Sequence, residues 1–544
     1  MRHLTLGALL VTLALPAAAQ QQAAPATRAA RAVDGTVMRA HLEFLADDAL
    51  EGRAPGTRGG DIAARYIASQ FQRLGLEPAG DSGSYFHRVP IVSLTPAPAL
   101  SVTAGGAART LAYRTDYVLW SMHDAPEVRA TGDLVWVGYG IVAPEYQWND
   151  YAGLDVKGKI VVALVNDPGL RDSTIFRGKV LTYYGRWTHK LEEAERQGAA
   201  GILLVHTDES ATYGWSTVAS SWTGPQVRVA RTAGPLKVAG WLSREAAGSL
   251  TGGGAALDRL MEESARKGFR PRPLDATAEA RVESTVRQSE TVNVLGRLPG
   301  RGPLAGEAVI IGGHYDHLGV GAPVDGDSIY NGAVDNASGT AAVLAIAEAF
   351  VKSQVRPARS LVFMGFGAEE SGLLGSTAFA ARPSIPLRRI AAVINVDEVN
   401  LNGRTRDVSA LGVDQSSLGI SFTRAAAAEG LKVSTSDQAL LKGFFFRSDH
   451  FPFVRAGVPA LYLQWGKDFV GQPPEFATRK ETEYNDKRYH QAADNVLPEF
   501  RYDGAEQVMK VIVRTALAVA NAPGQPTWNR NSEFREAGEA RLRQ

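Results

Sequence analysis

Two short motifs hold the residues with which this sequence could do chemistry. His314 and Asp316 follow an apolar run and two glycines, and Asp335 stands at the head of the apolar stretch Thr340–Val351. We expect a buried strand over Glu307–Ile311 that ends where His314 begins, because the glycines break the apolar run. In open α/β sheets, ligands bind beyond the carboxyl ends of the strands. The pattern favours a metal site, although a core histidine and a helix-capping aspartate are the alternative for either residue alone.

Strands followed by carboxylates recur downstream. The apolar run Arg359–Gly365 leads into Glu369 and Glu370, and the run Ile390–Val396 leads into Asp397. Parallel strands present their carboxyl ends at one edge of a sheet, so these side chains are expected near the first histidine. Neighbouring residues project in different directions, so one of the two glutamates should bind metal and the other should face water as a general base.

A second histidine completes the candidate set. The strand predicted over Pro459–Gln464 is followed by a polar stretch that carries His490. Because the chain has no cysteine, imidazoles and carboxylates from separate loops suit zinc or a comparable divalent ion. Five ligands exceed the three that one catalytic metal needs and suit two metals that share a bridging carboxylate, for which Asp335 is the natural choice. The five candidate ligands are His314, Asp335, Glu370, Asp397 and His490.

Length and composition limit the remaining possibilities. The chain has 544 residues, of which 45% are hydrophobic and 21% charged, which is ordinary globular usage for two or three domains. A formal net charge of +1 gives no reason to expect nucleic acid or an anionic membrane as a partner. The absence of cysteine excludes thiol catalysis and cysteine-ligated zinc.

The first residues have the pattern of a signal peptide. Residues 1–19 combine a basic start at Arg2, an apolar run over Leu4–Leu15 and small residues over Ala17–Ala19. We therefore expect an exported protein, periplasmic or secreted. No later segment reaches the roughly 18 consecutive apolar residues that a membrane helix needs, so the mature protein is expected to be soluble. Residues 20–36 are predicted to be a disordered linker.

The rest of the chain is predicted to hold one catalytic domain that an insertion divides. Helical spacing predicts scaffold helices near His41–Leu45, over Asp61–Leu74 and over Ala505–Ala520. The predicted divisions are a discontinuous catalytic domain over 37–130 and 284–525, an insertion over 131–268, a connecting segment over 269–283 and a polar tail over 526–544.

Short β-rich runs between turn residues characterise the insertion. We expect strands over Leu134–Val137, Lys159–Val165 and Gly201–Val205, with one helix over Trp187–Gln197. The insertion holds no metal ligand set, so it should act on access to the site, with Trp215–Trp222 as a candidate rim loop. The stretches that resemble a protease-associated domain are Tyr139–Ile141, Asp155–Val161 and Glu195–Val205.

The catalytic motifs resemble those of a known family in their order. They are His314-x-Asp316, Asp335-Asn336, Glu369-Glu370, Asp397 and Tyr489-His490. This order is similar to that of the secreted dizinc aminopeptidases of the aminopeptidase Y and aminopeptidase S type, whose relatives include glutamate carboxypeptidase, glutaminyl cyclase and the transferrin receptor ectodomain. The leader Leu50–Arg53 with Gly56-Thr57 also matches. The resemblance implies an α/β domain with a mixed, mostly parallel sheet between helices, interrupted by a β-rich insertion.

The resemblance also implies a role for each site residue. Asp316 would hold the ring of His314 through its carboxylate, and Tyr489 would help to stabilise the oxyanion. Arg447 is a candidate contact to substrate. Relatives hold the peptide bond after the bridging aspartate in cis, so the bond from Asp335 to Asn336 is expected to be cis. The implied roles are His314 and Asp397 on one zinc, Glu370 and His490 on the other, Asp335 as the bridge and Glu369 as the base.

The function that these residues predict is hydrolysis of a peptide bond, with release of the N-terminal residue. Glu369 would take a proton from the attacking water and pass it to the leaving amine. Carboxypeptidase or glutaminyl cyclase chemistry on the same site is one alternative. A non-catalytic, receptor-like binding protein is another, although an intact set of ligands and a base argues against it. An insertion beside the site would narrow the approach and favour chain ends.

Overall fold

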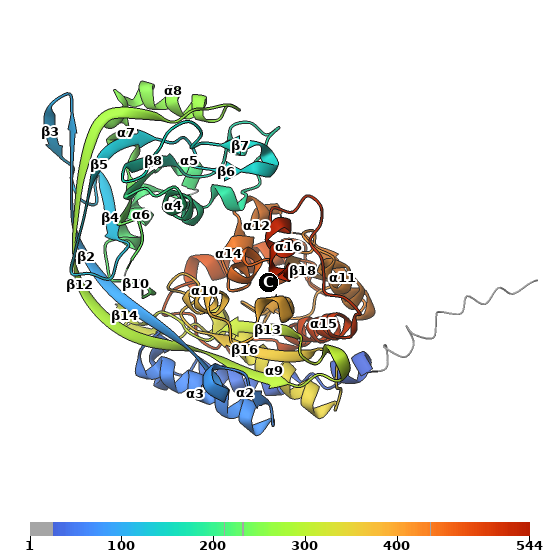
Figure 1. Cartoon of the computed structure of the whole chain (residues 1–544). Helices are drawn as coiled ribbons and strands as arrows, with labels where there is room; N and C mark the ends of the chain where they lie inside the picture. The colour runs from blue at the N-terminus through green and yellow to red at the C-terminus, as the bar shows by residue number, and fades with distance from the viewer. Residues whose placement is uncertain (1–24, 212, 231–232, 436, 544) are drawn as a thin grey trace, which may run out of the picture.

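One continuous sheet of 16 strands runs through the molecule (Figure 1). The computed structural model describes residues 25–543 except residues 212, 231–232 and 436. We call residues 105–271 the inserted unit and the remainder the main unit. The predicted signal peptide and the start of the predicted linker lie outside the described residues.

Four parallel strands form the centre of the main unit. Antiparallel strands flank them, with β18 (Asp407–Leu411) on one side and β12 (Arg272–Leu298) on the other. The predicted mixed, mostly parallel sheet is therefore confirmed for this unit. In order across the sheet the four strands are β20 (Ala460–Gln464), β17 (Ile390–Asn395), β13 (Ala308–His314) and β16 (Ser360–Phe366).

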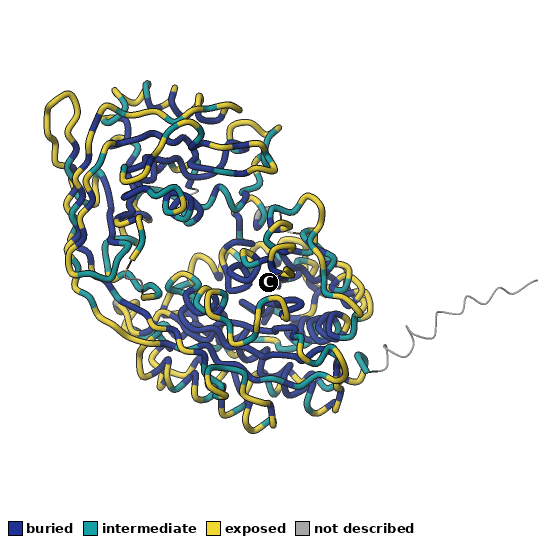
Figure 2. Tube along the Cα trace, in the orientation of Figure 1, coloured by how far each residue is buried: buried dark blue, intermediate teal, exposed yellow. Residues whose placement is uncertain are grey.

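Helices cover both faces of the central strands, which explains why these strands are apolar throughout. Val309 and Ile311 of β13 pack into the core on one face, whereas Ile310 packs into a second core on the other face. In Figure 2 the interior of the main unit is mostly coloured as buried and its outer segments as exposed. The helices on the first face are α2 (Gly35–Leu45), α3 (Arg58–Arg73), α9 (Gly339–Lys352), α11 (Leu418–Ala428) and α15 (Tyr502–Asn521). Those on the second face are α10 (Leu374–Ala381) and α13 (His450–Arg455).

The segment Ala333–Lys352, which ends with α9, is long and apolar enough to cross a membrane. Its most apolar window is 94% buried within the protein. Burial on all sides is the property of a helix in the core of a large domain. The helix carries Ala341, Leu344 and Ala345 into the first core, and its beginning lies next to the predicted bridging residue.

Two long antiparallel strands join the main unit to the inserted unit. β2 (Phe86–Ala104) pairs with β12 over its whole length, from Phe86 opposite Val294 to Ala104 opposite Ala276. Figure 1 shows this ribbon curving from the main unit to the inserted unit. The predicted connecting segment 269–283 therefore lies mostly within β12, so the connection between the two units is a strand. The alternation of exposed and buried residues along β12 explains why its apolar content was too low to predict so long a strand.

The inserted unit is an α/β layer structure and not a mainly β one. Its strands follow the order β5, β8, β9, β11 and β4, and the first three junctions are parallel. The predicted β-rich character is therefore wrong, since helices lie on both sides of the predicted strands. The strands are β4 (Tyr117–Ser121), β5 (Glu127–Trp136), β8 (Ile160–Leu164), β9 (Gly201–Val205) and β11 (Val238–Leu242). The principal helices are α4 (Trp187–Arg196), α7 (Arg244–Thr251) and α8 (Gly254–Ser264).

Both described ends of the chain pack against the main unit. Residues 25–31 are helical, and Ala29 and Ala30 are buried in the first core, so the linker prediction is wrong for this stretch. The C-terminal stretch is not a free polar tail either, because it forms α16 (Arg535–Arg543). Arg541 is buried there and donates hydrogen bonds to backbone carbonyl oxygens, including that of Gly457 at 3.0 Å. An arginine that satisfies buried carbonyls looks polar in sequence but is part of the interior.

Candidate metal centre

The predicted ligands come from loops at the carboxyl ends of the central strands. His314 is the last residue of β13, Glu370 lies in the loop after β16, and Asp397 lies in the loop after β17. His490 follows α14 (Phe476–Lys487). The structure therefore brings together all five predicted ligands, which are His314, Asp335, Glu370, Asp397 and His490.

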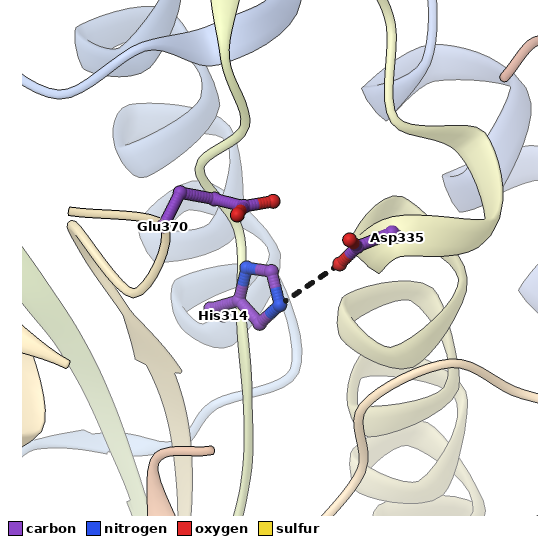
Figure 3. A group of neighbouring side chains, drawn as sticks. All are labelled: His314, Asp335 and Glu370. Carbon is purple, nitrogen blue, oxygen red and sulfur yellow. Dashed lines mark ion pairs between the residues drawn. The ribbon is translucent and has the colours of Figure 1, made fainter. Parts of the chain in front are cut away.

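Asp335 faces two of the other ligands, and Figure 3 shows its ion pair with His314. Its Oδ1 lies 3.3 Å from Nε2 of His314, and its Oδ2 lies 3.2 Å from Nε2 of His490. The two oxygens of one carboxylate thus face two different imidazoles, which is the arrangement that a bridging ligand requires. The peptide bond between Asp335 and Asn336 is cis, which confirms the expectation drawn from the resemblance.

The distances between the remaining pairs fit metal ions held between them. Oδ1 of Asp397 lies 3.2 Å from Nε2 of His314, and Oε2 of Glu370 lies 3.1 Å from Nε2 of His490. Two ligands of a tetrahedral zinc ion with bonds of about 2.1 Å stand about 3.4 Å apart, so each pair is close to that spacing. Nitrogen and oxygen donors without sulfur also fit zinc in a catalytic site. The residues present therefore fit two divalent ions.

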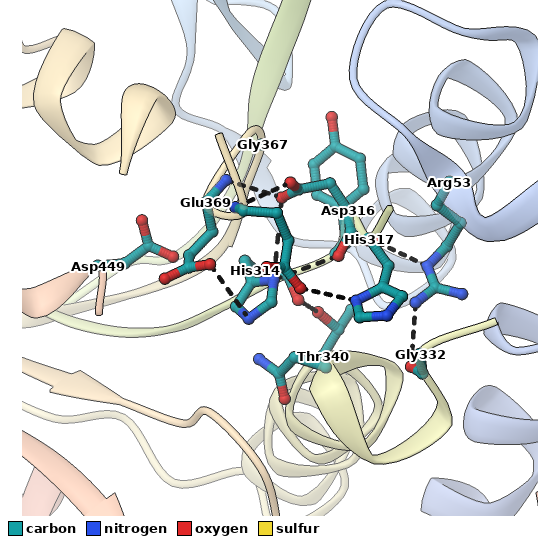
Figure 4. Close-up of polar contacts among 12 residues, drawn as sticks. Arg53, His314, Asp316, His317, Gly332, Thr340, Gly367, Glu369 and Asp449 are labelled. Carbon is teal, nitrogen blue, oxygen red and sulfur yellow. Dashed lines mark hydrogen bonds and ion pairs between the residues drawn. The ribbon is translucent and has the colours of Figure 1, made fainter. Parts of the chain in front are cut away.

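Glu369 stands beside the ligands at a longer distance. Its Oε2 lies 3.9 Å from Nε2 of His314 (Figure 4), against 3.2 Å for the nearest oxygen of Asp397. The donor atoms of these three residues all lie within 4.8 Å of one another, but the longer distance matches a base that faces the ligands. Burial raises the pKa of Glu369 well above its usual value, and nearby Glu370 adds to the effect although His314 opposes it. A carboxylate with a raised pKa suits proton transfer near neutral pH.

Asp316 holds the loop of the two glutamates and not the ring of His314. Its carboxylate accepts hydrogen bonds from the backbone N–H groups of Glu369 at 3.0 Å and Glu370 at 3.3 Å. Nδ1 of His314 instead lies 3.2 Å from the backbone carbonyl oxygen of Asp316, and the nearest carboxylate oxygen is 3.9 Å away. The predicted contact between carboxylate and ring is therefore wrong. The backbone carbonyl fixes the ring, so that Nε2 faces the site.

Two residues outside the predicted set support the ligands. Oγ of Ser448 donates a hydrogen bond to Oδ2 of Asp397 at 2.6 Å. Asp494 is fully buried, and its Oδ2 accepts hydrogen bonds from the backbone N–H groups of Val334 at 3.0 Å and Asp335 at 3.1 Å. Both contacts join segments far apart in the chain, so no local spacing could have indicated them. Ser448 directly follows Arg447, a candidate substrate contact predicted from the sequence.

His317, three residues after His314 in the chain, contacts Glu370, one of the predicted ligands. Its Nδ1 lies 2.7 Å from Oε1 of Glu370, and the ring is fully buried. This contact leaves the other oxygen of Glu370 to face His490. A partner of this kind orients a ligand carboxylate and tunes its basicity.

Arg53 fixes the backbone on which the ligands stand (Figure 4). Its side chain is 1% exposed and donates hydrogen bonds to the carbonyl oxygens of Tyr315 at 2.7 Å, Asn331 at 2.7 Å and Gly332 at 3.1 Å, and to that of Leu45. A guanidinium offers five donors in a fixed plane, so one side chain can satisfy several carbonyls at once. It thereby joins the end of β13 to the segment that leads into Asp335.

Neighbouring charges shift the pKa values of the central residues away from their usual range. Burial lowers the pKa of His314, but the carboxylates of Asp397 and Glu369 outweigh it, and the pKa stands well above its usual value. Burial raises the pKa of Asp335, but hydrogen bonds from His314 and His490 outweigh it and hold that pKa well below its usual range. The bridging carboxylate is thus anionic, which is the state that metal binding needs.

A cavity of about 610 Å³ opens onto the ligands. Tyr489 lines it and is 41% exposed, and its ring stacks on that of His490 at 4.0 Å between centroids. Arg447 also lines the cavity, and its guanidinium donates a hydrogen bond to the carbonyl oxygen of Lys442 at 2.8 Å. Both residues lie where contact with a ligand in the cavity is possible.

The predicted rim loop does not reach this cavity. The stretch forms α6 (Trp215–Ser221) inside the inserted unit, and Trp222 stacks on Trp120 at 4.1 Å between centroids. Trp215 donates its indole N–H to the carbonyl oxygen of Arg114 at 2.9 Å. The prediction is wrong because these tryptophans pack within the inserted unit. In the sequence, two tryptophans among polar residues had suggested a contact with substrate.

Comparison with known proteins assigns the part of the chain that carries the site. Residues 293–516 match the family model described as peptidase family M28. This stretch is therefore similar to the M28 peptidases. It spans every predicted ligand and Glu369, whereas Arg53 and the inserted unit lie outside it. The match rests on the sequence and does not depend on the distances described above.

Individual curated relatives of this chain are described as enzymes. A probable zinc metalloprotease of Pyrenophora tritici-repentis is 28% identical over 249 residues, which cover 40% of this chain and 54% of that protein. Leupeptin-inactivating enzyme 1 of Streptomyces exfoliatus is 28% identical over 258 residues, which cover 47% of this chain and 53% of that protein. The chain thus spans about half the length of the curated relatives it matches.

Solved structures also match over most of the chain. The aminopeptidase from Aneurinibacillus sp. strain AM-1 aligns over 92% of this chain and 97% of its own, with 20% identity and a TM-score of 0.46.

Proposed function

We propose that this protein is a zinc-dependent exopeptidase that removes N-terminal residues from peptides. One observation carries the proposal: the two oxygens of Asp335 face His314 and His490 at 3.3 and 3.2 Å, while Glu369 stands beside them at a longer distance. A bridging carboxylate between two histidines, together with a separate glutamate, is what a two-metal hydrolase needs. The M28 match and the zinc metalloprotease description of a relative support the same proposal.

The five ligands would hold two zinc ions in this proposal. When bound, such a pair supplies Lewis-acid activation of water and of the scissile carbonyl. His314 and Asp397 stand on one side of Asp335, and Glu370 and His490 stand on the other. Ser448 and His317 hold the outer oxygens of Asp397 and Glu370, so that these carboxylates present their other oxygens to the centre.

Glu369 moves the proton in the proposed mechanism. Its carboxylate accepts a proton from the attacking water while the water oxygen bonds to the carbonyl carbon. The raised pKa allows it to hold that proton until the bond from carbon to nitrogen breaks, when the proton passes to the leaving amine. Asp316 fixes the backbone of Glu369 during both transfers. Tyr489, on the cavity wall, is placed to donate a hydrogen bond to the developing oxyanion.

The inserted unit would restrict the approach to the site, and we propose that it is a protease-associated domain. Its loop 181–186 packs against the main unit, where the ring of Tyr183 lies 4.9 Å from Phe451 and 6.2 Å from Phe446 between centroids. Arg455 forms an ion pair with Glu192 at 2.8 Å across the same junction. A wall at this place favours chain ends over internal bonds. Export of the protein by its signal peptide is part of the proposal.

The test combines metal analysis with a panel of free and N-blocked peptides. We expect close to two zinc ions per chain, loss of activity on chelation and its return on addition of zinc. Free peptides should be cleaved and their N-acetylated forms should not. Cleavage of blocked peptides from the carboxyl end would point to a carboxypeptidase, and conversion of N-terminal glutamine without hydrolysis would point to a cyclase. A protein that binds peptides without turnover would sink the catalytic proposal.

A further inference from the structure

Among the described residues that line the cavity, one carboxylate lacks a partner. Asp335 faces two histidines, Asp397 faces His314 and Ser448, and Glu370 faces His317 and His490. Glu481, also on the cavity wall, forms an ion pair with Lys467. The carboxylate of Glu398 forms neither a hydrogen bond nor an ion pair with the described residues. The acidic residues that line the cavity are Asp335, Glu369, Glu370, Asp397, Glu398 and Glu481.

The backbone holds Glu398 firmly at the cavity wall. Its N–H donates a hydrogen bond to Oδ1 of Asn336 at 3.0 Å, and Nδ2 of Asn336 donates to the carbonyl oxygen of Val396 at 3.0 Å. Glu398 has a φ of 59°, in the left-handed region that residues other than glycine adopt rarely. An uncommon conformation held by its surroundings beside a reactive centre points to a function.

The charge of the centre favours a cation beside Glu398. Two zinc ions would bring four positive charges, and the ligand carboxylates of Asp335, Glu370 and Asp397 would offset three of them. Ionised Glu369 and Glu398 then leave one net negative charge in the cavity. An α-amino group with a pKa of about 7.7 to 8.0 carries the matching positive charge near neutral pH.

We propose that Glu398 binds the α-ammonium group of the substrate and so selects the amino end of a peptide. This inference rests on the proposed function. The α-nitrogen is separated from the scissile carbonyl by a single carbon atom, so the group that binds it must lie directly beside the metal ligands. Glu398 meets this condition because it follows the ligand Asp397 in the chain and lines the same cavity as Asp335 and Asp397. The cations Arg447 and Lys442, also on the cavity wall, would instead repel an ammonium group.

The experiment compares two substrates that differ only in the amino group. The substrates are leucine p-nitroanilide and 4-methylpentanoyl p-nitroanilide. Hydrolysis of each is measured with the zinc-loaded wild type and with zinc-loaded Glu398→Gln. We expect the substitution to lower kcat/KM for the amine substrate by about 10- to 100-fold, mainly through KM, and to leave the second substrate within about twofold. Glu398→Asp should restore part of the loss. Glu483→Gln, a partly exposed residue of α14 that pairs with Lys480, is the matched control and should change neither rate.

A binding measurement gives a readout independent of turnover. Calorimetry with leucinol, an amine without a scissile carbonyl, should show about 10- to 100-fold weaker binding to Glu398→Gln than to the wild type, whereas 4-methylpentanol should bind both alike. An unchanged preference for the amine in Glu398→Gln would overturn the inference. Loss of zinc from that variant would overturn it too, because Glu398 would then be a ligand. If the wild type hydrolyses neither substrate, the proposed function fails, and the leucinol measurement still decides the role of Glu398.

Discussion

The adjacent glutamates allow a sharp test of the site, because two nearly isosteric substitutions should have different effects. Glu369→Gln keeps the shape of the side chain and the backbone hydrogen bond to Asp316, but it removes the proton acceptor. Its Oε2 lies 3.9 Å from His314, against 3.1 Å between Glu370 and His490, so zinc content should stay near two ions per chain. Loss of a general base lowers kcat by about 10² to 10⁴, which equals roughly 3 to 5 kcal/mol of transition-state stabilisation.

Glu370→Gln is the matched comparison at the next position. The substitution removes the carboxylate that faces both His317 and His490, so we expect weaker binding of one zinc ion. Zinc per chain is measured after dialysis against a graded chelator, and kcat is measured at saturating zinc and substrate. Activity of Glu370→Gln should recover in part when zinc is raised, whereas that of Glu369→Gln should not. Zinc loss in Glu369→Gln with full metal retention in Glu370→Gln would show that the roles are reversed.

Three further predictions test the scaffold and the course of the reaction. Arg53→Met leaves four carbonyl oxygens without their donor, so we expect a lower melting temperature and weaker zinc binding in thermal and metal titrations. The control Arg39→Met removes one partner of an exposed ion pair and should change neither quantity. Burial raises the pKa of Glu533 from 4.5 to about 8, so the folded state holds the proton more tightly than the unfolded state. The free energy of unfolding should therefore fall as pH rises from about 4.5 to about 8. Glu533→Gln should therefore raise the melting temperature at pH 8 and change it little at pH 4, and equal effects at both pH values would contradict this sign. Time-resolved mass spectrometry of one long peptide should show residues released in order from the amino end, and early internal fragments would contradict the restricted approach.

The central strands and the ligands could be predicted because each depends on a local pattern. The run Val309–Ile311 is apolar on both faces, and the glycines after it mark the end of the strand at which His314 stands. The same pattern placed Glu369, Glu370 and Asp397 at one edge, since parallel strands share that edge. The apolar stretch Thr340–Val351, noted in the sequence, corresponds to α9.

The supporting contacts could not be predicted because they join distant segments. Asp494 reaches the backbone of Val334, and Arg53 reaches that of Asn331, without any spacing that relates them in the sequence. Asp316 shows a second limit, because its side chain and its carbonyl oxygen serve different partners and a motif cannot distinguish the two. The first half of β12 could not be predicted because exposed polar residues alternate with buried ones along it, and the exposed residues resemble those of a loop.

The ribbon of β2 and β12 has a mechanical consequence. The backbone hydrogen bonds between these strands continue through the junction of the two units, so no short loop is present there to act as a hinge. Motion of the inserted unit must bend or twist the ribbon as an elastic element, with small amplitude. Val294 at the end of β12 pairs with Gly365 of β16, the strand that leads into Glu369. A load applied to the inserted unit would therefore reach the loop of Glu369 and Glu370 through covalently continuous, hydrogen-bonded backbone.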